Sequence, residues 1–115
     1  MKKFLQVLVL SMMCAFSAVA DVSEPHIYNV TLTSANTEYS LALPAYSCNV
    51  TIQCRTAYDV RVAEVTGKVA GSTAPYWTIK ASGGYFDNNL KTNKTLYFAS
   101  AQAGVVVEVI IWGLD

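Results

Sequence analysis

Few residues of this 115-residue chain have a type and a setting that could support catalysis. Glu108 stands between Val107 and Val109 in an apolar stretch, where a raised pKa would let it act as a general base. A structural ion pair is the simpler interpretation, and we expect Arg55 or Arg61 to be the basic partner. No serine or cysteine nucleophile comes with a recognisable base and orienting group, so we expect the protein not to be an enzyme.

The residues that could bind a metal ion are too scattered to form a site. His26 is the only histidine of the chain, and zinc requires four ligands. The Asp-Asn-Asn segment at 87–89 lacks the spacing and the terminal glutamate of a calcium loop, and its short polar side chains are typical of a turn. The sequence therefore predicts neither a metal nor a cofactor.

Cys48 and Cys54 are the two cysteines that follow the N-terminal leader. Six residues of extended strand would separate them by roughly 20 Å, whereas bridged Cα atoms lie about 5.5 Å apart. We expect two buried thiols on one face of a strand. A disulfide is the alternative, and it would require a turn or bulge between the two residues.

Four aromatic residues could form a platform for a sugar or a peptide: Tyr76, Trp77, Tyr85 and Phe86. Packing in the core is the competing interpretation, because Trp77 lies in the middle of an expected strand. These four residues are the candidate contacts with a ligand or partner.

Residues 1–20 have the pattern of a secretory signal helix. Lys2 and Lys3 precede an apolar run, and an A-x-A sequence ends at Ala20, before Asp21. We expect cleavage after Ala20, export to the periplasm or the extracellular space, and no stable membrane span afterwards. An uncleaved anchor is the alternative.

Residues 21–115 are expected to form a single domain. Removal of Lys2 and Lys3 leaves six basic residues against eight acidic ones. Nucleic-acid affinity depends on clustered Lys and Arg, which this composition does not provide, so a nucleic-acid partner is excluded.

The elements that must position these residues are predicted to be strands. From Gly104 to Trp112, mostly β-branched residues occupy both faces of an extended strand, and only Glu108 is polar. No helical period is found after the leader. Seven strands are expected, at 26–33, 38–43, 46–55, 59–65, 76–81, 95–99 and 104–112, with residues 85–93 as a loop. The pattern predicts an all-β fold, a single small antiparallel β-sandwich with Greek-key or jelly-roll-like connections.

Several blocks of the chain carry a resemblance to a known group of proteins. They are 39–45 (YSLALPA), 53–57 (QCRTA) with 59–61 (DVR), 75–81 (PYWTIKA), 95–100 (TLYFAS) and the strand at 104–112. In these blocks the chain resembles small, mostly uncharacterised virion-associated proteins of tailed phages.

This resemblance implies a structural or accessory protein, a virion or decoration component that binds a protein partner or further copies of itself. The N-terminal leader does not fit this resemblance, because virions assemble in the cytoplasm and a secretory signal directs a protein out of it. An exported bacterial module that binds a glycan or a protein partner is the alternative function.

Overall fold

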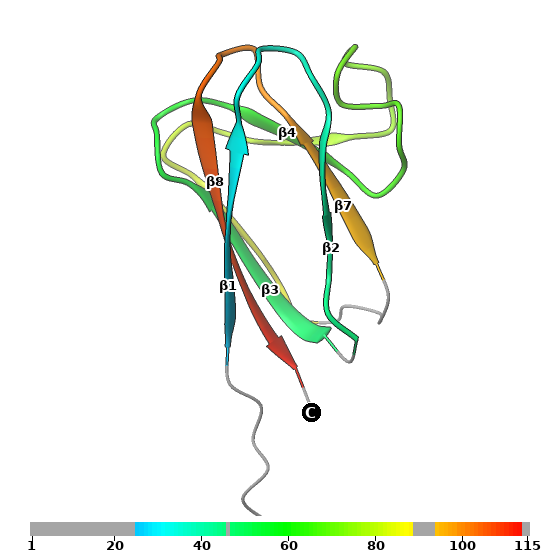
Figure 1. Cartoon of the computed structure of the whole chain (residues 1–115), viewed down its shortest axis with the longest axis vertical. Helices are drawn as coiled ribbons and strands as arrows, with labels where there is room; N and C mark the ends of the chain where they lie inside the picture. The colour runs from blue at the N-terminus through cyan, green and yellow to red at the C-terminus, as the bar shows by residue number, and fades with distance from the viewer. Residues whose placement is uncertain (1–24, 46, 89–93, 114–115) are drawn as a thin grey trace, which may run out of the picture.

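The computed structural model describes residues 25–45, 47–88 and 94–113, and these form two facing antiparallel sheets of four strands each (Figure 1). The expected signal helix lies outside the described residues. The strands are β1 (His26–Leu32), β2 (Tyr39–Ala42), β3 (Ser47–Cys54), β4 (Val60–Ala63), β5 (Trp77–Ile79), β6 (Gly84–Asp87), β7 (Thr95–Ala99) and β8 (Val105–Gly113). No helix among these residues is long and apolar enough to cross a membrane.

The strand order is that of a jelly roll. One sheet, which we call sheet A, has the order β1-β8-β3-β6, and the other, sheet B, has the order β2-β7-β4-β5. The first strand therefore pairs with the eighth, the second with the seventh, the third with the sixth and the fourth with the fifth. The predicted all-β sandwich is confirmed, including the jelly-roll alternative for its connections.

One strand more than expected is present. β6, Gly84–Asp87, falls in the segment that the sequence pattern placed in a loop. It is short, it begins with a glycine, and it is paired on one side only, with β3. A strand of this kind gives little alternation for a sequence pattern to detect.

The strand β8 lies at the centre of sheet A, between β1 and β3. Its alternate valines, Val105, Val107 and Val109, are fully buried between the sheets, because side chains alternate across a strand. Glu108 lies on the opposite, outer face, so the apolar stretch keeps its acidic residue out of the core. The interior is filled by apolar side chains that include Phe98, Leu32, Ile52, Val62 and Ile111.

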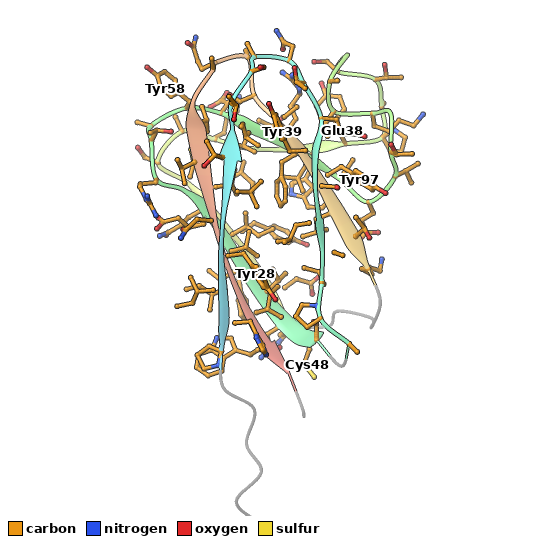
Figure 2. All side chains as sticks on the ribbon, viewed as in Figure 1. Tyr28, Glu38, Tyr39, Cys48, Tyr58 and Tyr97 are labelled. Carbon is orange, nitrogen blue, oxygen red and sulfur yellow. The ribbon has the colours of Figure 1, made fainter. Side chains whose placement is uncertain are left out.

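A second, smaller cluster lies on the outer face of sheet B. The loop 64–76, which joins β4 to β5, folds back over this face and buries Val69 completely against Ala63 and Ala99. Glu38 accepts hydrogen bonds from the Thr66 hydroxyl at 2.7 Å and from the Gly67 amide at 2.8 Å. These bonds fix the loop on the sheet, on the side where Glu38 and Tyr97 are labelled in Figure 2.

The two cysteines differ from the expectation in their burial. No disulfide joins them, but both Cys48 and Cys54 are half-buried instead of fully buried. The pairing of β3 with β8 shifts between Ser47 and Asn49, so Cys48 falls in an irregularity at the start of β3. Figure 2 labels Cys48. Cys54 keeps the regular alternation and packs against the core.

Candidate functional site

A surface cavity of about 270 Å³ lies where the strands β4 and β5 diverge into the loop 64–76. Six residues line it: Ala63, Glu64, Val65, Pro75, Tyr76 and Trp77. The antiparallel pairing of Val62 with Trp77 brings the end of β4 beside the start of β5, and this pairing places the two halves of the wall together. Five of the six residues are apolar or aromatic, so the cavity suits an apolar group.

Trp77 links this cavity to the interior of the sandwich. Its ring centroid is 5.3 Å from that of Tyr85, and the two planes are tilted by 42°. Since Trp77 belongs to sheet B and Tyr85 to sheet A, the contact joins the two layers at their β5 and β6 edges. The Trp77 Nε1 atom is buried and has no hydrogen-bond partner among the described residues, so the indole ring is held by packing.

The hydroxyl group of Tyr85, the residue that packs against Trp77, is itself held by a hydrogen bond. It donates a hydrogen bond to the Asp87 carboxylate at 3.3 Å. Burial, together with the nearby negative charge of Asp87, raises the pKa of Tyr85 above its ordinary value. The phenol therefore stays neutral at neutral pH.

The four candidate aromatics do not form one platform. Tyr76 and Trp77 line the cavity, and Tyr85 contacts Trp77. Phe86 follows Tyr85 in β6, so its side chain points to the opposite face of sheet A, where it is 61% exposed.

An ion pair lies beside the cavity wall. Lys94 Nζ is 2.7 Å from the Glu64 carboxylate, and both side chains are partly exposed. The pair connects the start of the loop 64–76 with the residue that precedes β7. Glu64 is the one charged residue that lines the cavity, and its charge is compensated by Lys94.

The two arginines expected near Glu108 have different positions. Arg55 forms the ion pair, with Nη2 3.2 Å from the Glu108 carboxylate. Arg61 does not contact Glu108, because it belongs to sheet B and lies under the loop 64–76. There it donates to the Val69 carbonyl at 2.6 Å and to the Asn36 side chain at 2.8 Å. The expectation that Arg61 is a partner of Glu108 is therefore corrected.

Sequence reasoning found the aromatic half of the cavity but not the half that comes from β4. Val65 is 53% exposed, and an exposed valine near a strand end gives no specific signal. Only the pairing of β4 with β5 brings residues 63–65 beside residues 75–77, and the strand order could not be read from the sequence. Within the ranges that the structure describes, no three His, Cys, Asp or Glu side chains come together as metal ligands.

Comparison with known proteins gives no family. No family model matches the chain, and no curated protein matches it. Among solved structures, the chain is similar to a de novo designed double-stranded β-helix determined by NMR, with 12% identity, a TM-score of 0.46, and coverage of 81% of this chain and 100% of that one. It is also similar to Aeromonas hydrophila PliG, a periplasmic inhibitor of g-type lysozyme, with 12% identity, a TM-score of 0.40, and coverage of 84% and 89%. Both TM-scores are low, and neither likeness carries an argument about this chain.

Proposed function

We propose that this chain is an exported, non-catalytic protein that binds a protein partner. The cavity between β4 and β5 holds an apolar side chain of that partner. The observation that carries the proposal is the apolar wall of this cavity, formed by Val65, Pro75, Tyr76 and Trp77. The leader at residues 1–20 supplies the route out of the cytoplasm.

The size of the cavity favours a single side chain. A volume of about 270 Å³ is just below the range for sites that hold whole small molecules, which is about 300 to 1,000 Å³. An anchor residue that enters a preformed apolar pocket is a common central feature of protein interfaces. Trp77 packs against Tyr85 of the other sheet, so this wall of the pocket is formed without the partner.

A glycan fits the lining less well. Sugars present several hydroxyl groups, which require polar partners when they leave water. The lining provides one charged side chain, Glu64, and this carboxylate is already paired with Lys94 at 2.7 Å. The chemistry of the site therefore favours an apolar group over a sugar.

The proposal is tested by NMR titration of the exported protein with side-chain mimics. We expect the N-acetyl amides of phenylalanine and leucine to shift the backbone amide signals of Ala63, Val65 and Trp77, and methyl glucoside to leave them unchanged. A response to the glucoside alone, or no response to any probe, would contradict the proposal.

Matched variants assign the response to the cavity. Val65→Asp places a charge on the exposed wall and should abolish the shifts. Phe86→Asp places the same charge at a similarly exposed position on the outer face of sheet A and should leave the shifts unchanged. N-terminal sequencing of the exported protein should begin at Asp21, and a retained Met1 in the membrane fraction would show that the leader is an anchor.

A role as a virion accessory or decoration protein is the second candidate. The resemblance of blocks such as 75–81 and 95–100 to phage virion-associated proteins favours it. Jelly rolls occur in capsid and lectin domains, but a fold alone does not assign a function. Mass spectrometry of purified virions and of periplasmic extracts distinguishes the two candidates, because each predicts the protein in only one of these fractions.

A further inference from the structure

We propose that β1 is the edge through which two copies of this chain pair. The two β1 strands would run antiparallel about a two-fold axis at Asn29 and join the two A sheets into one sheet of eight strands. This inference concerns the edge of sheet A and is independent of the cavity between β4 and β5.

The four edge strands of the described sheets differ in length. β2 and β6 have four residues each and β5 has three, whereas β1 has seven. Short edges are one of the ways in which proteins avoid pairing with other chains. β1 lacks this protection, and it contains no proline, lysine or acidic residue from His26 to Leu32. Its register with β8 is continuous, so no bulge twists the edge away.

The direction of the hydrogen bonds of β8 shows which backbone groups of β1 are left unpaired at its free edge. The Arg55 amide donates to the Val106 carbonyl at 2.9 Å, so the peptide groups of Val106 face β3. In an antiparallel sheet these directions alternate, and the peptide groups of Val105, Val107, Val109 and Ile111 therefore face β1.

Their partners in β1 are Leu32, Val30, Tyr28 and His26. The amides and carbonyls of the three residues between them, Ile27, Asn29 and Thr31, point away from β8 to the open edge. All three residues are exposed, Ile27 to 65%. Three donors and three acceptors are thus available to one added strand.

A second copy is the occupant that these three residues fit best. With Asn29 opposite Asn29 of the other copy, Ile27 faces Thr31 in both directions, and each pair exchanges two hydrogen bonds. On the inner face Tyr28 meets Val30, an aromatic and β-branched pair that is favourable across strands. No like charges oppose each other within the paired strands, and the charge of Arg55, which donates to Asn29 at 3.0 Å, is compensated by Glu108. Two-fold pairing through one identical surface is also the commonest form of homo-oligomer.

Light scattering of the exported protein over a dilution series tests the proposal. We expect a dimer that dissociates on dilution, and we expect Asn29→Pro to be monomeric at concentrations where the wild type is dimeric. Proline removes the amide at the centre of the new pairing and spares the bonds to β8.

Phe86→Pro is the matched control. By the same alternation its amide points to the free edge of β6, so this variant should stay dimeric. A wild type that is monomeric at every concentration, or a folded Asn29→Pro variant that remains dimeric, overturns the proposal.

Cross-linking decides the question if Asn29→Pro fails to fold. In the proposed pair the two Asn29 Cα atoms are about 5.5 Å apart, a separation that a disulfide spans. Under mild oxidation Asn29→Cys should therefore give a covalent dimer on a non-reducing gel, while wild type and Phe86→Cys should not. Absence of a covalent dimer from Asn29→Cys, or an equal amount from Phe86→Cys, would refute pairing at this edge.

Discussion

Arg55 Nη2 lies 3.2 Å from the Glu108 carboxylate on the outer face of sheet A. The same nitrogen donates to the Asn29 side chain at 3.0 Å, and Gln53 donates to Glu108 at 3.2 Å. One guanidinium therefore connects the end of β3 with the neighbouring strands β8 and β1. The acidic residue in the apolar strand is balanced at the surface and carries no cost of burial in the core.

Glu108→Gln should lower the free energy of unfolding by less than about 1 kcal/mol. The side chains of Arg55 and Glu108 are 53% and 28% exposed, so water screens much of their attraction. The amide that replaces the carboxylate can still accept a hydrogen bond from Arg55. Urea denaturation measures the change, and a loss of about 3 to 5 kcal/mol would instead indicate a buried pair.

Trp77→Ala should lower the free energy of unfolding by about 3 kcal/mol, as truncation of a large packed side chain does. Trp77 packs against the core and contacts Tyr85 across the two sheets. Phe86→Ala is the control, because its exposed ring should contribute no more than about 0.5 kcal/mol. Chemical denaturation compares the two variants, and equal losses would show that Trp77 contributes no more to stability than an exposed aromatic ring.

The alternation of apolar residues was sufficient to predict the sandwich, because burial between two sheets imposes a period of two on each strand. The segment 105–112 shows this most clearly, with Val105, Val107 and Val109 buried and Glu108 outside. The prediction that Glu108 has a basic partner relied on the cost of an uncompensated charge. The choice between Arg55 and Arg61 required the strand order, since Arg61 belongs to the other sheet.

The cavity could be predicted only in part, because the strand order was needed here too. Its aromatic half is contiguous in sequence, at 75–77, but its other half comes from 63–65, and a long loop separates the two. Cys48 illustrates a second limit, because the irregularity between Ser47 and Asn49 interrupts the alternation on which the prediction of a shared buried face was based.

Thiol titration of purified protein that begins at Asp21, under denaturing, non-reducing conditions, should find two thiols per chain. No disulfide joins Cys48 to Cys54, and they lie at opposite ends of β3, an extended strand of eight residues. The distance along such a strand is far larger than a disulfide can span. The same titration after reduction is the control, and a count that rises from none to two in monomeric protein would show an intramolecular bridge.

Asp59 should make the stability of the domain depend on pH in the acid range. Its carboxylate accepts a hydrogen bond from the Ala81 amide at 2.7 Å and lies 3.4 Å from Lys80 Nζ, so it connects the residue before β4 with the segment after β5. The hydrogen bond from Ala81, followed by the interaction with Lys80, lowers the pKa of Asp59 below its ordinary value of 3.8. The folded state therefore favours the ionised form of Asp59. The stabilising effect of this carboxylate is present above pH 3.8 and is lost as the pH falls through the lowered pKa.

Thermal melting of wild type and Asp59→Asn over a pH series measures this effect. We expect the wild type to melt at the higher temperature near neutral pH, and the difference to shrink toward zero as the solution becomes more acidic than the ordinary pKa of 3.8. Lys80→Gln should keep most of this pH dependence, because the amide of Ala81 is the larger cause of the lowered pKa. A difference in melting temperature between wild type and Asp59→Asn that grows on acidification would mean that the folded state favours the protonated carboxyl. That is the opposite of what the hydrogen bond from the Ala81 amide predicts.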